Sequence, residues 1–160
     1  MRLLLLSMPI CLAGLACAGP GGIAAGELHV GPLHYLNDTS TVLRTVGPPA
    51  QRRGPSAVAG GPLDIWRWDH LQCLLVTGWH CDQLSTTDSS FEVGPGLRVG
   101  MRLEELQQRL GAPAARRQSG DTTFVIYDLK GKGRGFGLSA GATQDTVRTL
   151  AVGQLTFVFM

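Results

Sequence analysis

The sequence predicts an α+β fold built from two tandem units, each a helix followed by a three-stranded antiparallel meander, with both units sharing one sheet. One observation behind this prediction is the leucine pattern of residues 103–110, which marks a short helix followed by segments rich in strand-forming residues. The other is an internal repeat. The segment GPPAQRR at 47–53 aligns with GAPAARR at 111–117 at a shift of 64 residues, with five identical positions.

Residues 1–18 have the pattern of an export signal. An arginine follows the first methionine, residues 3–15 are mostly apolar, and Ala16-Cys17-Ala18 has the small-x-small form of a cleavage site. Cleavage after Ala18 is the favoured prediction. The alternatives are lipidation of Cys17, which would hold the protein on a membrane, and a buried N-terminal strand or helix. The pattern predicts an exported protein that is periplasmic, associated with the outer membrane, or secreted.

The first unit, residues 27–94, follows a glycine-rich segment at 19–26 that we expect to be a flexible lead. Its helix is expected at 41–46, because several N-cap residues precede it and Gly47 ends it. Residues 91–93 fit either a last strand of this unit or the approach to the next. The other expected elements are a short strand at 28–33, a loop at 55–62, hairpin strands at 65–68 and 71–76 around an Asp69-His70 turn, a turn at 77–78, a returning strand at 79–81 and a polar linker at 84–90.

The second unit covers residues 95–160. Leu103, Leu106 and Leu110 fall on one helix face, and Gly111 followed by Pro113 is a helix stop signal. The elements expected after this helix are a loop at 118–121, strands at 122–129, 135–140 and 146–152, turns at 130–134 and 141–145, and an apolar C-terminal segment at 154–160 paired inside the sheet.

The start of the second unit resembles a known family. Val99–Met101, the leucine-spaced helix, Gly111 and Pro113 together resemble the SmpA/OmlA small envelope lipoproteins. The pattern is also similar to the β-lactamase-inhibitor-protein fold, which duplicates such a unit in tandem. The resemblance implies a broad sheet face used for protein contacts. Arg102 departs from the family pattern, in which a serine or threonine commonly caps the helix.

Cys73 and Cys81 are the two cysteines that remain after removal of an export signal. Two cysteines on either side of a predicted turn, in an oxidising compartment, favour a disulfide. The alternative is a zinc site that adds His70 and His80 to the two cysteines, although this spacing matches no common zinc finger.

Three tryptophans are candidate protein-binding residues. Trp66 and Trp68 alternate along one predicted strand and therefore share a face, and Trp79 lies near the second cysteine. Exposed indoles are typical anchors of protein interfaces. The alternative for Trp66 and Trp68 is packing in the core, which is the commoner use of large aromatic residues in small sheets.

Composition and charge limit the functional classes. A net charge of +2 and a charged fraction of 16% give no reason to expect nucleic-acid binding. The basic turn at 130–135 fits either a solvated hairpin tip or contact with phosphate or an anionic lipid surface. The arginine pairs at 52–53 and 116–117 carry the same two interpretations.

No motif predicts catalysis. The chain lacks the G-x-S-x-G and H-E-x-x-H patterns, and Asp64, Asp69 and Asp82 have no spacing that indicates paired acid–base work. We therefore expect no enzyme, no cofactor and no metal. The predicted function is a non-enzymatic exported bacterial envelope protein that binds another protein, as an accessory in envelope maintenance or outer-membrane assembly. The alternatives are a secreted enzyme-inhibitor-like protein and an uncharacterised enzyme of the envelope.

Overall fold

The fold is centred on an antiparallel sheet of eight strands, which a computed structural model shows together with two α-helices and a two-stranded ribbon. The structure describes residues 23–58, 61–75, 79–94, 96–129 and 136–155. The predicted signal at 1–18 with Cys17, the turn at 77–78, the basic turn at 130–134 and the C-terminal residues 156–160 lie outside the described residues. The elements in chain order are a 3₁₀ turn (Ala25–Glu27), β1 (His29–Val30), β2 (Leu33–His34), α1 (Thr39–Val46), β3 (Gln51–Val58), β4 (Gly61–Arg67), β5 (Leu71–Leu75), β6 (Gln83–Thr86), α2 (Leu103–Leu110), β7 (Ala115–Ser119), β8 (Thr122–Asp128), β9 (Phe136–Thr143) and β10 (Thr146–Gln154).

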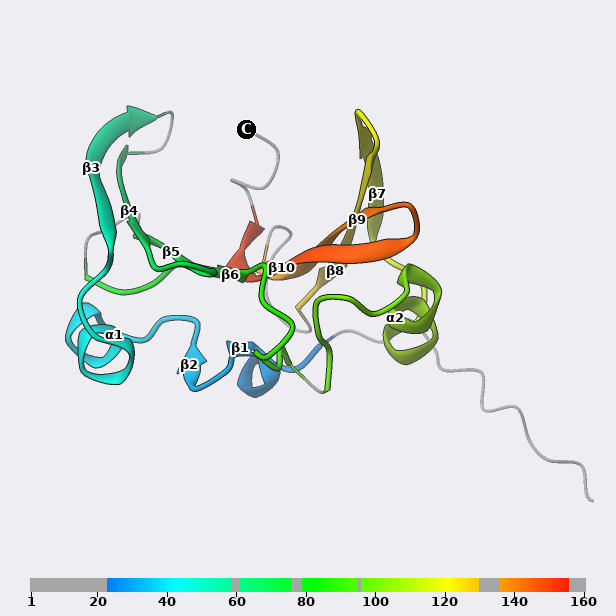
Figure 1. The fold of residues 1–160 in the computed structure, drawn as a ribbon, viewed down its shortest axis with the longest axis horizontal. Helices are drawn as coiled ribbons and strands as arrows, with labels where there is room; N and C mark the ends of the chain where they lie inside the picture. Colours follow the sequence, from blue (N-terminus) through cyan, green and yellow to red (C-terminus); the bar gives the residue numbers. More distant parts are fainter. Residues whose placement is uncertain (1–22, 59–60, 76–78, 95, 130–135, 156–160) are drawn as a thin grey trace, which may run out of the picture.

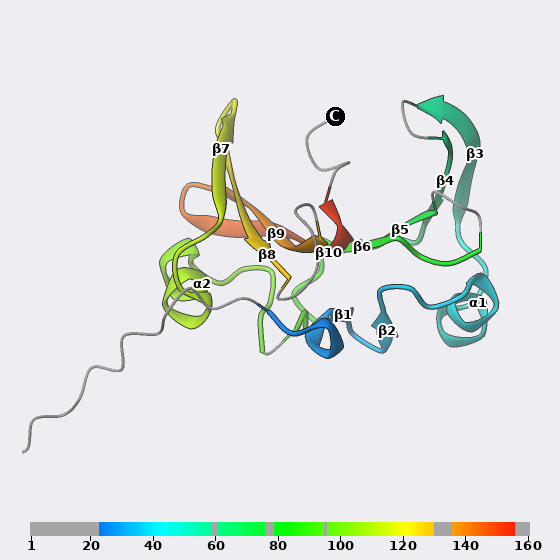
Figure 2. The ribbon, with the colours of Figure 1, turned by 180° about the vertical axis from the view of Figure 1, so that it is seen from behind.

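Both helices lie on the same side of the sheet. Figure 1 shows α1 beneath the β3 end of the sheet and α2 beneath the β7 end, with the β1–β2 ribbon between them. The two ends of the sheet bend away from the helices, and the opposite view in Figure 2 shows the same curvature. The sheet therefore has a helix side, where the main core forms, and a concave side. In the described part of the chain, no helix is long and apolar enough to cross a membrane.

From either edge of the sheet, the strands follow chain order as far as the centre. The order is β3-β4-β5-β6-β10-β9-β8-β7, so each helix is followed by four strands and the two sets meet at β6 and β10. At this junction Ser85 lies opposite Ala151, flanked by the pairs Leu84–Val152 and Thr86–Leu150. A shift of 66 residues converts either flanking pair into the other. The pairing at the centre of the sheet therefore has local two-fold symmetry.

The prediction of three strands per unit is wrong, because both edge strands were missed in whole or in part. Residues 115–119 form β7, all of whose residues are exposed, where the helix exit and a loop from residue 118 are expected. Residues 55–58, read as a loop, complete β3, in which the register shifts between Arg53 and Ser56. Pro55 lies at this irregularity, where a missing N–H costs little in an edge strand. Edge strands that bury few side chains have no alternating apolar pattern to detect.

The central strand β6 differs from the expected polar linker at 84–90. Leu84 and Thr86 are buried, and the strand pairs with both β5 and β10. The Thr86 hydroxyl donates to the His70 carbonyl oxygen (2.9 Å), so a buried polar side chain is satisfied there. The expected returning strand at 79–81 is instead a connection to β6, in which His80 makes a single bridge with Asp38.

The helices agree with the sequence-based expectation. Leu103, Leu106 and Leu110 are all buried, each contributing about 2 kcal/mol from burial, and Gly111 ends α2 with φ of 81°. Helix α1 begins at Thr39, two residues earlier than expected, because the Asp38 side chain accepts a hydrogen bond from the Thr41 N–H (2.7 Å). Arg102 precedes α2 without a side-chain cap, because its guanidinium offers no acceptor for the first free N–H groups of the helix.

The remaining strands of the second half lie close to their expected places. Strand β8 matches the expected span, whereas β9 and β10 run further than expected and leave only Gln144 and Asp145 as their turn. Within the segment expected to be a flexible lead, Ile23 is buried and bridges Leu129. Residues 91–93 prove to be an approach to the second half, with Val93 bridging Val30 and Leu97.

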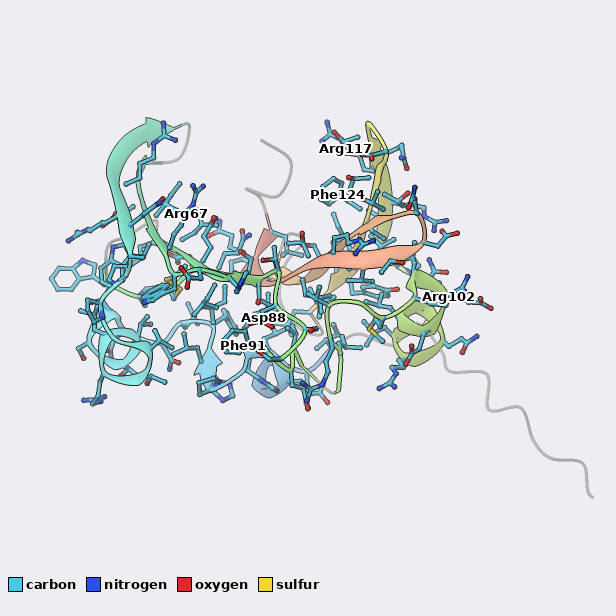
Figure 3. All side chains as sticks on the ribbon, viewed as in Figure 1. Arg67, Asp88, Phe91, Arg102, Arg117 and Phe124 are labelled. Carbon is cyan, nitrogen blue, oxygen red and sulfur yellow. A yellow bond between two sulfur atoms is a disulfide. The ribbon has the colours of Figure 1, made fainter. Side chains whose placement is uncertain are left out.

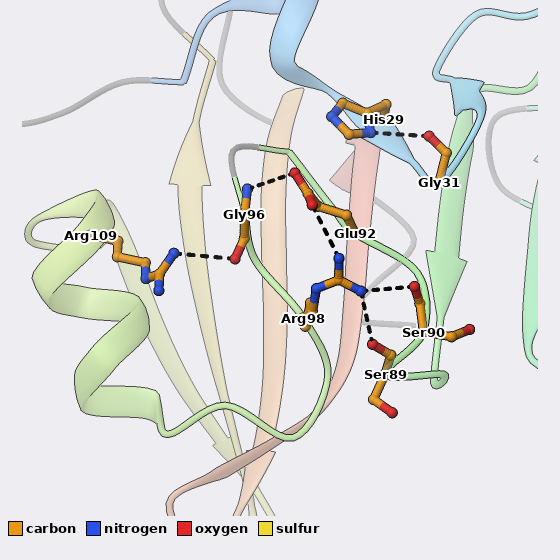
Figure 4. A network of polar contacts seen from close by, with 8 residues as sticks. All are labelled: His29, Gly31, Ser89, Ser90, Glu92, Gly96, Arg98 and Arg109. Atoms are coloured by element: carbon orange, nitrogen blue, oxygen red, sulfur yellow. Dashed lines mark hydrogen bonds and ion pairs between the residues drawn. The ribbon is translucent and has the colours of Figure 1, made fainter.

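A polar network holds the connection between the two halves (Figure 4). The Arg98 guanidinium donates to the Glu92 carboxylate (3.2 Å) and to the Ser90 carbonyl oxygen (2.9 Å). Arg109 of α2 donates to the Gly96 carbonyl oxygen (3.2 Å), and the Gly96 N–H donates to Glu92 (3.2 Å). These bonds link residues within the connection to one another and link the connection to α2.

Candidate functional site

The predicted disulfide is present. Cys73 of β5 and Cys81 of the following connection are bonded, with 5.8 Å between their Cα atoms, and both are buried. The bond occupies both thiols, so they are not available to the alternative zinc site. The described residues contain no group of three or more His, Cys, Asp or Glu side chains placed to hold a metal ion.

Trp66 is a core residue, and this removes it as an exposed binding anchor. It is 6% exposed, its indole N–H donates to Asp64 (3.1 Å), and the Arg52 guanidinium lies 5.3 Å from its ring centre. Arg52 also forms an ion pair with Asp64 (2.7 Å). The face that Trp66 shares with Trp68 points toward the helices. A large aromatic side chain on this face gains more free energy from burial than from exposure to solvent.

Trp68 is half-buried and belongs to the same aromatic pair. Its ring contacts that of Trp66 edge-on, with 6.3 Å between centroids, and its indole N–H donates to the Gly47 carbonyl oxygen (3.2 Å) at the end of α1. Trp68 therefore fastens β4 to α1. The core interpretation of this pair, left open by the sequence, is the one that the structure supports.

Trp79 differs from the other two tryptophans because its side chain is 78% exposed. The connection that carries it is held at several points. The Thr39 N–H donates to the Trp79 carbonyl oxygen (3.1 Å), the Cys81 N–H donates to Asn37 (2.9 Å), and the disulfide follows two residues later. The Trp79 ring is thus exposed to solvent on a backbone segment that hydrogen bonds and the disulfide hold in place.

Two exposed leucines come from the segments that hold Trp79. Leu36 is 48% exposed and its N–H donates to the Cys81 carbonyl oxygen (2.8 Å); Leu43 is 39% exposed and lies one helical turn beyond Thr39. We refer to Leu36, Leu43 and Trp79 as the Trp79 surface. Among the described residues these are the exposed large hydrophobic side chains. Sequence reasoning included Trp79 but not the leucines, although Leu43 falls off the helix face defined by Val42 and Val46.

The concave side of the sheet carries a different set of side chains. Arg67 lies on it at one end, because the neighbouring Trp66 faces the helices, and Arg117 and Phe124 lie opposite each other at the other end. Figure 3 shows Arg67 and the Arg117–Phe124 pair on the two raised ends of the sheet. The arginine pairs at 52–53 and 116–117 thus occupy the two edge strands, where charge opposes edge-to-edge association.

A polar hollow of about 320 Å³ lies beside the β4–β5 turn on the concave side. Its polar groups are largely engaged with one another. Arg67 donates to the Gln72 side chain (3.1 Å), and the Thr86 hydroxyl donates to the His70 carbonyl oxygen. Of the three acids considered for catalysis, Asp64 is held by Arg52 and Trp66, while Asp82 lies 3.4 Å from His80. The groups that line the hollow offer hydrogen-bonding contacts.

Comparison with known proteins identifies neighbours at the level of shape alone. No protein-family model matches the sequence, and no characterised protein matches it. One solved structure similar to this chain is an extracellular protein containing a SCP domain from Bacillus anthracis, with a TM-score of 0.48 and 11% identity over 78% of this chain and 45% of that one. Another is a candidate beta-lactamase inhibitor protein from Streptococcus mutans, with a TM-score of 0.31 and 15% identity over 81% of this chain and 93% of that one.

Proposed function

We propose that this chain is an exported, non-enzymatic protein that binds another protein through the Trp79 surface. The observation that carries the proposal is the exposure of Trp79 on a connection held by the disulfide and by backbone hydrogen bonds to the start of α1. Tryptophan is enriched among residues that dominate binding energy, and a held backbone lowers the entropy lost on association. Leu36 and Leu43 are exposed apolar residues on the segments that hydrogen-bond to the Trp79 connection.

Export is supported by the signal pattern of residues 1–18 and by the disulfide. Disulfides persist in oxidising compartments and are rare in the cytosol. Within this proposal, the context is the bacterial envelope, with a role in envelope maintenance or outer-membrane assembly. Lipidation of Cys17 would place the protein on a membrane, whereas cleavage after Ala18 would release it into the periplasm or the medium.

The two halves of the chain, residues 27–94 and 95–160, are proposed to be copies of one unit. Two observations support this origin: the repeat at 47–53 and 111–117, and the order of one helix and four strands in each half. The SmpA/OmlA resemblance of the second unit is consistent with this origin and stays part of the proposal.

A secreted enzyme inhibitor is the second candidate function. The observation that favours it is the curvature of the sheet, whose concave side carries Arg67 at one end and Arg117 with Phe124 at the other (Figures 1 and 3). A convex loop of an enzyme would fit such a face. The two candidates therefore place the partner on different surfaces of the same molecule.

Site-specific photo-crosslinking in the producing cell separates the two surfaces. A photoreactive phenylalanine derivative would replace Trp79, or Arg67 on the concave side, or Glu104 on the exposed side of α2 as the control. We expect one adduct of constant mass from position 79 and none from position 104, because a defined interface contacts only its own surface. An adduct from position 67 alone would transfer the function to the concave side. Equal adducts from all three positions would contradict a defined interface.

A further inference from the structure

A second hollow, of about 360 Å³, lies between the end of α1, the β4–β5 turn and the segment that follows β6. Val46 of α1, Trp68 just after β4, and Phe91 form apolar parts of its lining, and Asp69, His70 and Asp88 form the polar part. Its volume is at the lower end of the range for ligand pockets, about 300–1,000 Å³. We refer to it as the Trp68–Phe91 pocket.

The two aromatic side chains that line this pocket have defined positions. Trp68 is held by its hydrogen bond to the Gly47 carbonyl oxygen (3.2 Å) and by its contact with Trp66. Phe91 is half-buried, packs against the core and lies over Gly31, where a Cβ atom would come within 2.6 Å of its ring. Aromatic faces of this kind attract an alkyl chain by apolar contact and a cation by their π electrons.

The polar part of the pocket is negative. Asp88 accepts a hydrogen bond from the Ser90 N–H (2.8 Å), and this bond, the Ser90 hydroxyl and the nearby His70 hold the pKa of Asp88 below its usual value. Asp69 is exposed beside it. The ion pairs formed by arginines among the described residues involve Asp64, Glu92 and Glu105, so neither pocket carboxylate is neutralised by one of these arginines.

The C-terminal end of α1 adds to this negative potential. Val46 is the last residue of α1, and the unpaired carbonyl groups at a helix C-terminus favour a positive charge. Arg67, the nearest arginine in sequence, shares the concave-side hollow with Asp69 but does not line the Trp68–Phe91 pocket, and its guanidinium donates to Gln72. Apolar walls, two carboxylates and a helix C-terminus therefore converge on one opening.

We propose that the Trp68–Phe91 pocket binds a basic side chain, lysine or arginine, of a partner polypeptide. The alkyl stem packs against Trp68 and Phe91, and the charged group meets Asp69 and Asp88. The inference rests on the proposed protein-binding function, but it assigns a site distinct from the Trp79 surface.

The test uses small probes, so it does not require the partner. The full mature chain is titrated at pH 8 with N-acetyl-lysine-N-methylamide, N-acetyl-arginine-N-methylamide or the neutral N-acetyl-norleucine-N-methylamide. Two-dimensional ¹H–¹⁵N spectra resolve the indole N–H of each tryptophan. We expect a saturable shift of the Trp68 signal with the basic probes and about fivefold weaker binding of the neutral probe. The Trp66 and Trp79 signals serve as internal references.

Variants assign the charged contact. Asp69→Asn with Asp88→Asn should weaken binding of the lysine probe about fivefold, because both charges are removed while the amide oxygen introduced by Asp88→Asn can still accept the Ser90 N–H bond. Asp121→Asn, in the turn between β7 and β8, is the matched control and should bind the probe unchanged. Melting temperatures of all three proteins confirm that the fold is retained.

Three results would overturn the inference: equal binding of the norleucine and lysine probes, unchanged lysine binding by the double variant, or no Trp68 shift up to about 50 mM probe, above the millimolar range expected of one side chain. Any of these would leave the Trp79 crosslink unaffected. Conversely, absence of a crosslink at position 79 with a positive titration would retain the pocket and reject the proposed interface.

Discussion

The two halves of the sheet follow the same order of elements but are stabilised differently. Helix α2 buries three leucines under its end of the sheet, whereas Val42 is the fully buried residue of α1. The first half has the disulfide between Cys73 and Cys81 and the Trp66–Trp68 pair instead. A half with a smaller helix contact thus depends on a covalent bond and on large aromatic side chains.

A comparison of residues near the same place in the two halves shows the consequence. Trp66 lies opposite Arg52, and Val125 lies opposite Arg116; Trp68 and Tyr127 each follow two residues later. Trp68 is half-buried beside an open pocket, whereas Tyr127 is 2% exposed. Burial raises the pKa of Tyr127 to about 12. At this pair of positions the first half leaves aromatic surface accessible and the second does not, and the Trp79 surface and the Trp68–Phe91 pocket both lie in the first half.

The largest expected effect separates core from surface tryptophans within the first half. Trp66→Ala should lower the free energy of unfolding by about 3–5 kcal/mol, because it opens a cavity and removes the indole donor from Asp64. Trp79→Ala should change it by no more than about 0.5 kcal/mol. Urea denaturation followed by far-UV circular dichroism measures both values. Equal losses for the two variants would contradict the distinction between the core pair and the Trp79 surface.

The next effect tests whether the disulfide acts on one half only. The double variant Cys73→Ala with Cys81→Ala should cost roughly 2–3 kcal/mol, the chain-entropy estimate for a short loop. Local hydrogen exchange should accelerate at the Thr39 amide, whose acceptor is Trp79, and remain unchanged in α2. If α2 amides that exchange by local opening accelerated as much as the Thr39 amide, the disulfide would stabilise both halves and not the first half alone.

The smallest effect concerns the two helix starts. The Ser40 hydroxyl and the Thr41 N–H donate to the Asp38 carboxylate and hold its pKa below the ordinary value of 3.8. A depressed folded-state pKa gives a contribution that is complete above pH 3.8 and disappears as the pH falls through the lower folded value. Exchange of the first α1 amides should therefore accelerate below about pH 3.8, while those of α2 show no such step.

Two variants sharpen this comparison. Asp38→Asn keeps a capping acceptor but removes the charge, so α1 should lose the acid step. Arg102→Asp should transfer a cap and an acid step to α2, with a gain of roughly 0.5–1 kcal/mol near neutral pH. Hydrogen exchange monitored by NMR from acid to neutral pH measures the amide exchange rates at the starts of α1 and α2 in the same sample of each protein. An unchanged acid step in Asp38→Asn would assign it to another group.

Local sequence patterns were sufficient to predict the elements that depend on residues close together in the chain. The buried face of α2, its end at Gly111, the β4–β5 hairpin around Asp69 and the Cys73–Cys81 bond follow from periodicity, backbone preference and spacing. In each case residues within about ten positions of one another supply the physical cause, because helix faces, caps and short covalent loops involve near neighbours in the chain.

Only the tertiary structure decided the features that depend on distant partners. Strand β6 has little apolar pattern of its own and becomes central because β10, far along the chain, pairs with it. Strand β7 buries no side chain and is defined by its bonds to β8. The three tryptophans are chemically identical in the sequence, and their exposure depends on which distant segments pack against them. Burial is a property of the assembled layers, so it decided that Trp66 belongs to the core and Trp79 to the surface.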